Sequence, residues 1–117
     1  MDQINHSLPI REPTHPGEYI GEDILAEFGL TQQELADRLN VSRRTINELV
    51  NKRRGVSPDM ALRLARLTGS TPEIWLRLQM VHDLWRARRD NDPTLLAIRP
   101  LVSPAPGSDA APDRPAE

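Results

Sequence analysis

The chain has 117 residues and a formal net charge of −2, with 38% apolar residues but only 3% aromatic ones. This composition suits one domain with a single small core and excludes a large multilayered architecture. The absence of cysteine excludes a disulfide framework and thiolate metal ligands. No apolar run approaches the roughly 18 residues that a membrane span needs, and the amino terminus does not look like a secretion signal. We therefore expect a soluble, cytoplasmic protein.

The charges are unevenly distributed along the chain. Residues 1–30 carry six acids and one base, whereas residues 31–54 carry six bases and three acids. The positive potential is therefore concentrated in the middle of the sequence, where a polyanion could use it.

The composition divides the chain into four parts. Residues 1–13 form an amino-terminal arm, and residues 14–91 carry the helical pattern of one domain. Residues 92–102 are expected to form a short strand or an extended arm. Residues 103–117 are rich in Pro, Ala, Ser and Asp, which predicts a disordered tail.

Helix start and stop signals follow one another closely after residue 15. Pro16 is suited to a first helical position and Gly29 to a stop, which predicts one helix over residues 16–28 with apolar positions at Ile20, Ile24, Leu25 and Phe28 on one face. Thr31 with Glu34 forms a capping box for a second helix that ends near Asn40.

Two further helices follow the same rules. Ser42 caps a third helix, whose inward positions are Ile46, Leu49 and Val50 and whose outward face is basic and amide-rich. The pair Ser57-Pro58 starts a fourth helix, which carries apolar residues at 61, 64, 65 and 67 and ends at Gly69.

The fifth expected helix runs from Glu73 to about Arg89. Its apolar residues are spread around too much of its circumference to form a single apolar stripe. Either it is a central buried helix, or one side packs on the domain and the other on a second copy of the chain. We favour the second interpretation. The candidate dimer-interface residues are Trp75, Leu78, Val81, His82 and Trp85, with Trp75 reaching into the core.

Two short capped helices joined by a tight turn are the arrangement of a helix-turn-helix. The stretch from Leu30 to Gly55 resembles the lambda-repressor/Cro-like (XRE) family over its whole length. The residues that carry this resemblance are Thr31-Gln32, Ala36, Val41-Ser42, Ile46 and Leu49. The resemblance implies an all-α, five-helix, lambda-repressor-like domain with flexible amino- and carboxy-terminal arms.

The flanking segments narrow the resemblance. The motifs HPGE (15–18), KRR (52–54), SPDMALRLA (57–65) and STPEIWLRLQ (70–79) are similar to the HigA/VapI group of antitoxins, over about residues 14–85. In that family the antitoxin is a homodimer that represses its own operon by binding operator DNA at an inverted repeat. It also neutralises HigB, an mRNA-cleaving toxin. The resemblance thus implies these partners, with no cofactor, metal, membrane or small-molecule substrate.

A helix-turn-helix places its second helix in the major groove, where arginine can bond guanine O6 and N7. We expect Arg43 and Arg44 to read bases, and the family's pattern adds Glu48 as a cytosine contact and Thr45 and Asn47 beside that face. The expected phosphate contacts are Thr31, Gln32, Ser42, Asn51, Lys52, Arg53 and Arg54. The alternatives are a merely solvated helix face and, for residues 52–54, a solubilising loop.

Catalysis has little support in the sequence. The three histidines lack the spacing of a metal site on one helix, and His15 is expected to shape the start of the first helix. Glu18, Glu22 and Asp23 suit the amino end of a helix better than a pair of catalytic carboxylates. We therefore expect no enzyme, and the alternatives to an antitoxin are a free-standing repressor and an interaction module that no longer binds DNA.

Two segments are candidates for the toxin-binding surface. The first is the acidic amino-terminal part, with Ile4, Leu8, Ile10 and the first helix, and the second is the segment from Leu95 to Val102. We favour the first, because an excess of acids attracts a cationic ribonuclease.

Overall fold

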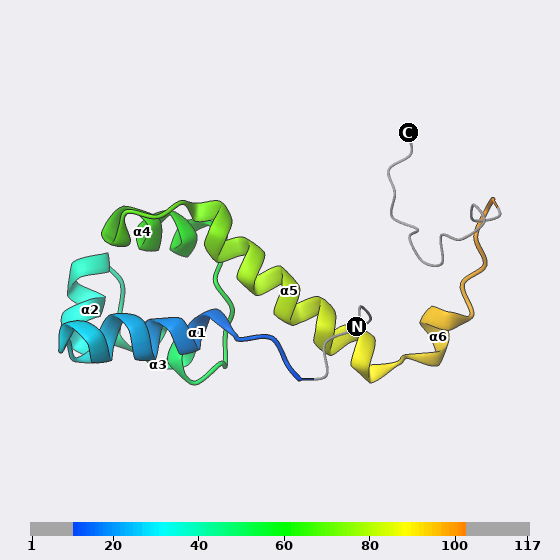
Figure 1. Ribbon diagram of the computed structural model, residues 1–117, viewed down its shortest axis with the longest axis horizontal. Helices are drawn as coiled ribbons and strands as arrows, with labels where there is room; N and C mark the ends of the chain where they lie inside the picture. Colours follow the sequence, from blue (N-terminus) through cyan, green and yellow to red (C-terminus); the bar gives the residue numbers. More distant parts are fainter. Residues whose placement is uncertain (1–10, 103–117) are drawn as a thin grey trace, which may run out of the picture.

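The computed structural model describes residues 11–102, and all regular structure in this range is helical (Figure 1). The elements are α1 (Pro16–Tyr19), the π-helix η2 (Ile20–Ala26), α2 (Gln32–Leu39), α3 (Arg43–Val50), α4 (Pro58–Thr68), α5 (Pro72–Asp90) and α6 (Pro93–Leu96). The expected second, third, fourth and fifth helices are confirmed to within two residues at each end. None of these described helices is long and apolar enough to cross a membrane.

The capping residues act as the sequence predicts. Thr31 Oγ1 accepts a hydrogen bond from the Glu34 N–H at 3.0 Å, and Glu34 Oε1 accepts one from the Thr31 N–H at 2.9 Å. The Ser42 and Ser57 hydroxyls accept hydrogen bonds from N–H groups three residues on. Asn40 ends α2 in the left-handed conformation, with φ of 61°. The amino-terminal ends of α2, α3 and α4 are thus fixed by local hydrogen bonds, whereas Thr71 makes no side-chain capping bond at the start of α5.

The first helix differs from the expectation. It begins at Pro16 and stops at Gly29, as predicted, but its middle is η2, a π-helix of seven residues. The wider i→i+5 turn removes later residues from the α-helical register. Ile20 and Ile24 are buried as expected, whereas Phe28 is 71% exposed and does not belong to the core.

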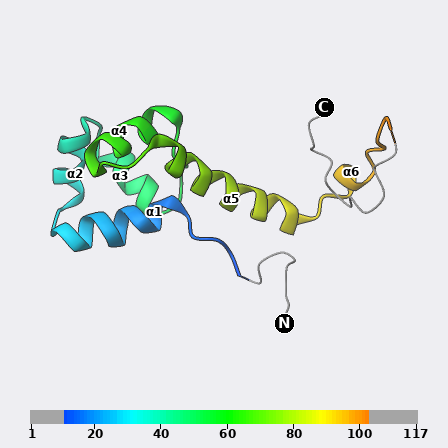
Figure 2. The same ribbon diagram turned by 45° about the horizontal axis from the view of Figure 1, so that its top comes forward.

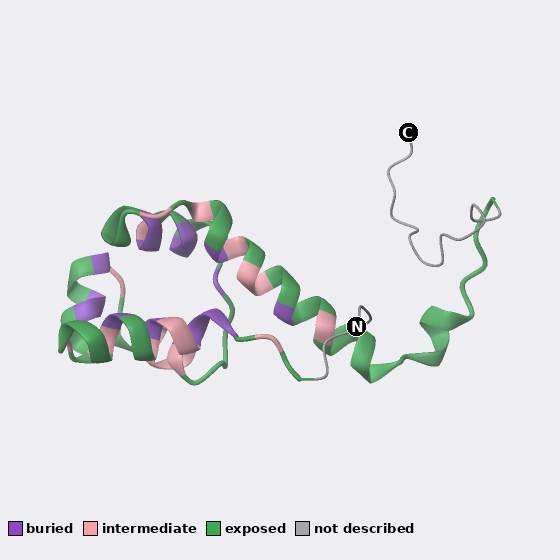
Figure 3. Cartoon of the chain, viewed as in Figure 1, coloured by how far each residue is buried: buried purple, intermediate pink, exposed green. Residues whose placement is uncertain are grey.

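The helical segments η2, α2, α3 and α4 surround a small apolar core. The fully buried side chains include Ile20 of η2, Leu35 of α2, Ile46 and Leu49 of α3, and Leu64 of α4. α2 packs against α3, and α4 packs against both α2 and α5. Buried segments are therefore concentrated in this bundle and become scarce along α5 (Figure 3).

α5 leaves the bundle and extends away from it, with α6 beyond its far end (Figures 1 and 2). Its buried residues are Trp75 and His82, whereas Ile74, Met80, Val81 and Leu84 are exposed. The interpretation as a central buried helix is therefore wrong for the single chain.

Two of the candidate dimer-interface residues are buried within their own chain, as expected for Trp75 and contrary to expectation for His82. Trp75 is 7% exposed and donates its indole N–H to Ser70 Oγ at 3.0 Å, and His82 is 2% exposed and contacts Glu12. Both side chains are occupied by their own chain, so they cannot offer surface to a second copy. Leu78, Val81 and Trp85 keep partly or largely exposed surfaces, and Arg89 lies over the Trp85 ring.

Residues 92–102 contain a short helix, α6, where a strand or an extended arm was expected. Asp92 Oδ1 accepts a hydrogen bond from the Thr94 N–H at 2.9 Å, and Pro93 occupies the first helical position. These two local start signals favour a helical turn at this point of the chain. The expected disorder of residues 103–117 lies outside the described residues, as do positions 1–10.

His15 does shape the start of α1, as predicted, because its Nδ1 accepts the Gly17 N–H at 2.8 Å. Its ring stands edge-on to that of His82, with the ring centroids 4.8 Å apart. Burial and the neighbouring charge of His82 lower the pKa of His15. Lys52 acts in the same direction, whereas Asp83 and Glu18 oppose it.

We expect this buried histidine to make folding dependent on pH. Because the pKa of His15 is lower in the folded chain, the unfolded chain takes up the proton first as the pH falls. The stability is fully present above the unfolded pKa, about 6.5, and declines below it. Urea unfolding between pH 8 and pH 5 should show a smaller loss for His15→Asn, whose amide can accept the Gly17 N–H without titrating. Equal losses in both proteins would contradict this role.

Candidate nucleic-acid interface

α2 and α3 meet at a tight turn that directs α3 outward. The Val41 N–H donates to the Ala36 carbonyl at 2.9 Å and the Asn40 N–H to the Asp37 carbonyl at 3.2 Å. Ala36 is fully buried, and its small side chain allows the two helices to approach closely. With Ile46 and Leu49 buried, the opposite side of α3 is left for polar side chains.

The amino-terminal end of that polar face carries two exposed arginines. Arg43 forms no ion pair with another described residue, and Arg44 is 85% exposed while its Nε lies 3.0 Å from Glu48 Oε2. The two terminal nitrogens of Arg44 form no hydrogen bond with another described residue. The first turn of α3 can therefore present guanidinium donors to base edges, which is the chemistry that pairs with guanine.

Glu48 is more constrained than the sequence indicates. Its carboxylate accepts hydrogen bonds from Arg54 at 2.7 and 2.9 Å and from Arg44 at 3.0 Å. These bonds from Arg54 and Arg44 lower the pKa of the Glu48 carboxyl. The arrangement suits orienting two arginines, and the expected cytosine contact of Glu48 stays a prediction.

Polar side chains connect the start of α2 to the face of α3. Asn47 Nδ2 donates to Gln32 Oε1 at 3.2 Å, which holds Gln32 beside the free N–H groups at the start of α2. Thr45 Oγ1 lies 2.9 Å from the Ser42 hydroxyl, and Asn51 Nδ2 donates to the Asn47 carbonyl. Gln32 with Asn47 and Ser42 with Thr45 thus form two hydrogen-bonded pairs near the amino-terminal ends of α2 and α3, where free N–H groups favour a phosphate.

Of the three basic side chains at 52–54, two form ion pairs with other described residues and one does not. Lys52 has φ of 61° and places its Nζ 2.6 Å from Glu18 Oε2, an interaction that raises the pKa of Lys52. Arg54 is held by Glu48. Arg53 forms no ion pair with another described residue, so it is the member of this run best placed for a phosphate.

Two supporting residues were not singled out from the sequence. Arg63 of α4 donates from Nη1 to the Leu39 carbonyl at 3.0 Å, at the end of α2, while its Nε donates to Asp59. Gln79 of α5 accepts the Val56 N–H at 2.8 Å. Both interactions join residues more than 20 positions apart, so no local pattern could have revealed them.

Comparison with known proteins agrees with this geometry. A helix-turn-helix family model matches residues 22–76. The virulence-associated protein I of Dichelobacter nodosus is 41% identical over 78% of this chain and 83% of that protein. The antitoxin HigA-1 of Vibrio cholerae is 34% identical over 78% of this chain and 86% of its own length. The chain belongs to the HigA/VapI family of helix-turn-helix proteins.

A solved structure supports the same assignment for the fold. The Pseudomonas aeruginosa antitoxin HigA, determined with the higBA promoter, superimposes with a TM-score of 0.71 at 37% identity. The match covers 78% of this chain and all of that one. The HigA/VapI family consists of DNA-binding proteins, and the described residues contain no group of three or more acids and histidines able to hold a metal.

Proposed function

We propose that this HigA/VapI-type chain is a cytoplasmic antitoxin that represses its own operon and has no enzymatic activity. The observation that carries the proposal is the pair of outward guanidinium groups of Arg43 and Arg44 at the start of α3. The same fold has been solved with promoter DNA in a protein 37% identical to this one. The proposed second partner is a HigB-type mRNA-cleaving toxin.

The exposed side of α5 supports a homodimer. Met80, Val81 and Leu84 are each more than 40% exposed and follow one another along the middle of the helix. In a dimer whose two α3 helices lie about 34 Å apart, the helices would read half-sites one DNA turn apart. The proposed operator is therefore an inverted repeat in the protein's own promoter.

The toxin is proposed to bind on the acidic amino-terminal part of the chain. Glu22 and Glu27 are exposed on the first helix and have no ion pairs with other described residues. A basic ribonuclease would meet complementary charge there. Ile4, Leu8 and Ile10, named with this surface from the sequence, lie outside the described residues.

The DNA half of the proposal is tested by fluorescence anisotropy with a labelled duplex of the chain's own promoter. We expect binding tighter than to an unrelated duplex by at least about 1,000-fold, and an affinity that falls steeply with salt. Equal affinity for both duplexes would exclude an operator-specific repressor. A complete lack of salt-dependent binding would favour the interaction module.

The toxin half is tested by expressing the neighbouring small reading frame with and without this protein. We expect growth arrest from the neighbour alone, recovery on co-expression, and copurification of the two proteins. The variant Arg44→Ala should still restore growth, because Arg44 is assigned to DNA. A harmless, non-binding neighbour would leave the free-standing repressor as the better assignment.

A further inference from the structure

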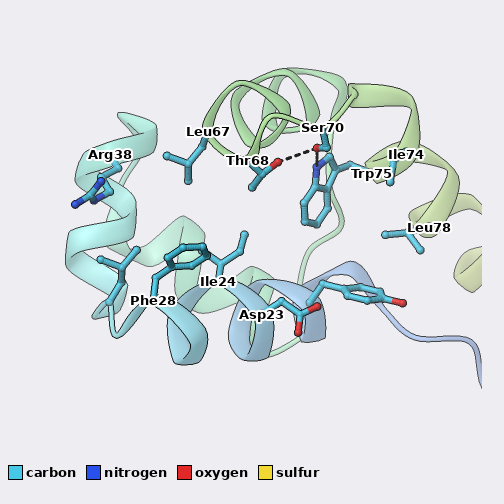
Figure 4. Close-up of a pocket in the computed structure, with 12 residues that line it drawn as sticks. Asp23, Ile24, Phe28, Arg38, Leu67, Thr68, Ser70, Ile74, Trp75 and Leu78 are labelled. Atoms are coloured by element: carbon cyan, nitrogen blue, oxygen red, sulfur yellow. Dashed lines mark hydrogen bonds between the residues drawn. The ribbon is translucent and has the colours of Figure 1, made fainter.

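An apolar groove of about 730 Å³ opens between η2, α2, α4 and α5 (Figure 4). Its walls include Ile24, Phe28, Leu67, Ile74 and Trp75. Phe28, Leu67 and Ile74 are exposed apolar side chains that would lose contact with water if the groove were filled. None of the residues that line the groove belongs to α3, so the candidate base contacts on α3 do not account for it.

Charged side chains mark the rim of this groove. Asp23 of η2 and Arg38 of α2 line it, and neither forms an ion pair with another described residue. An occupant with an apolar stretch and a nearby positive charge would therefore match both the walls and Asp23.

The carboxy-terminal arm, defined as residues 92–102, has these properties. Its large apolar side chains are all at least 54% exposed, namely Leu95, Leu96, Ile98, Leu101 and Val102. The arm lies beyond the far end of α5 and is exposed throughout (Figure 3). Arg99 lies within the arm, directly after Ile98, and has no ion pair with another described residue. Such an exposed apolar cluster marks an interaction surface.

The helical part of the arm is too short to bring Leu95 and Leu96 to the groove of their own chain. At 1.5 Å per residue, the 16 residues from Trp75 to Asn91 separate the groove from the start of the arm by about 24 Å. Leu96 lies five residues after Asn91, which is at most about 18 Å even for fully extended chain. The helical turn of α6 shortens this reach further.

The arm of a second copy of the chain can start much closer to this groove. The exposed side of α5 is centred near Val81, which is also the midpoint of the helix from Pro72 to Asp90. If two α5 helices pair antiparallel about Val81, Asn91 of one copy lies opposite Thr71 of the other. The arm of each copy then begins beside the groove of its neighbour.

We propose that in the dimer the arm of each copy lies in the groove of the other, with its apolar side chains on the groove walls and Arg99 beside Asp23. This inference rests on the dimer proposed above. The exchange would couple the two copies through contacts in addition to those between the α5 helices.

Cysteine cross-linking tests the exchange directly, because the natural chain has no cysteine. The full-length variants Leu67→Cys and Ile98→Cys are co-expressed with different tags, and the dimer with both tags is isolated and oxidised. We expect a disulfide between the two chains. The control pairs Ile98→Cys with Leu62→Cys, an exposed α4 residue outside the groove, and should link at least about tenfold more slowly.

The possible outcomes distinguish a failure of the arm exchange from a failure of the dimer. A protein that sediments as a monomer overturns both proposals. A dimer in which the position 67 pair links no faster than the position 62 pair overturns the arm exchange and leaves the dimer standing. A double variant carrying both Leu67→Cys and Ile98→Cys that closes a disulfide within one chain overturns the exchange as well.

A second measurement uses the arm alone. Replacing Leu96 and Ile98 by Asp should raise the dimer dissociation constant by at least about tenfold, because burying one such side chain is worth at least that factor. Leu62→Asp should leave it unchanged. Since the arm makes no core contact, a folded variant with an unaltered dissociation constant overturns the exchange.

Discussion

Replacing Arg44 by alanine is expected to weaken operator binding by about 1–3 kcal/mol at each half-site, or about 5- to 150-fold. The guanidinium leaves the first turn of α3 outward, and its Nε bond to Glu48 fixes its direction. Loss of a base contact removes sequence information, so binding to an unrelated duplex should change little. Anisotropy titrations of both duplexes at one salt concentration measure the difference.

Two other arginines serve as matched controls for Arg44. Arg53→Ala should weaken binding to both duplexes similarly and lower the salt slope by about 0.9 per subunit, because it removes one phosphate contact. Arg66→Ala, at the exposed end of α4, should leave both affinities unchanged. If Arg44→Ala behaves like Arg53→Ala, Arg44 contacts the backbone and does not read a base.

Replacing Gly17 by alanine should destabilise the fold at or above the upper end of the usual overpacking range, about 1–3 kcal/mol. A Cβ on Gly17 would stand 1.9 Å from the Leu49 carbonyl oxygen, so α1 would have to move away from the backbone of α3. Because α3 carries the arginines, operator affinity should fall together with stability. Urea unfolding followed by circular dichroism measures the free energy of unfolding.

Gly21 provides the control within the same helical segment. The nearest neighbour of a Cβ at Gly21 is Val50 Cγ1 at 3.5 Å, an ordinary contact. Gly21→Ala should therefore be neutral or stabilising by about 0.5–1 kcal/mol, because alanine costs less conformational entropy than glycine in a helix. Similar losses for the two variants would show that backbone freedom, and not the approach of α1 to α3, decides the effect.

The helix boundaries were predictable because their causes are local. Thr31, Ser42 and Ser57 each cap an N–H group three residues on, and Asn40 accepts a left-handed φ at the end of α2. Such interactions need only neighbouring residues, which a sequence displays directly. The helix-turn-helix and its outward arginines follow from the same short-range signals.

Several features of the candidate site depended on residues distant in sequence. Glu18 engages Lys52 across 34 positions, and Arg63 bonds the end of α2 from α4. These contacts decide which basic side chains already have a partner in the chain and which are available to contact DNA. No spacing rule predicts them, because they depend on how the helices are placed against one another.

The sequence by itself determined the helix-turn-helix and its capped ends, because hydrogen bonds and apolar spacing within one helix specify them. The family followed from the resemblance of its motifs to those of HigA/VapI antitoxins. Only the tertiary structure decided that Phe28 leaves the core, that His82 faces inward, and that residues 93–96 form a helix. The physical reason is the same in the first two cases. Whether an apolar or aromatic side chain is buried depends on what the other helices place against it, and that is set by packing between segments far apart in the chain.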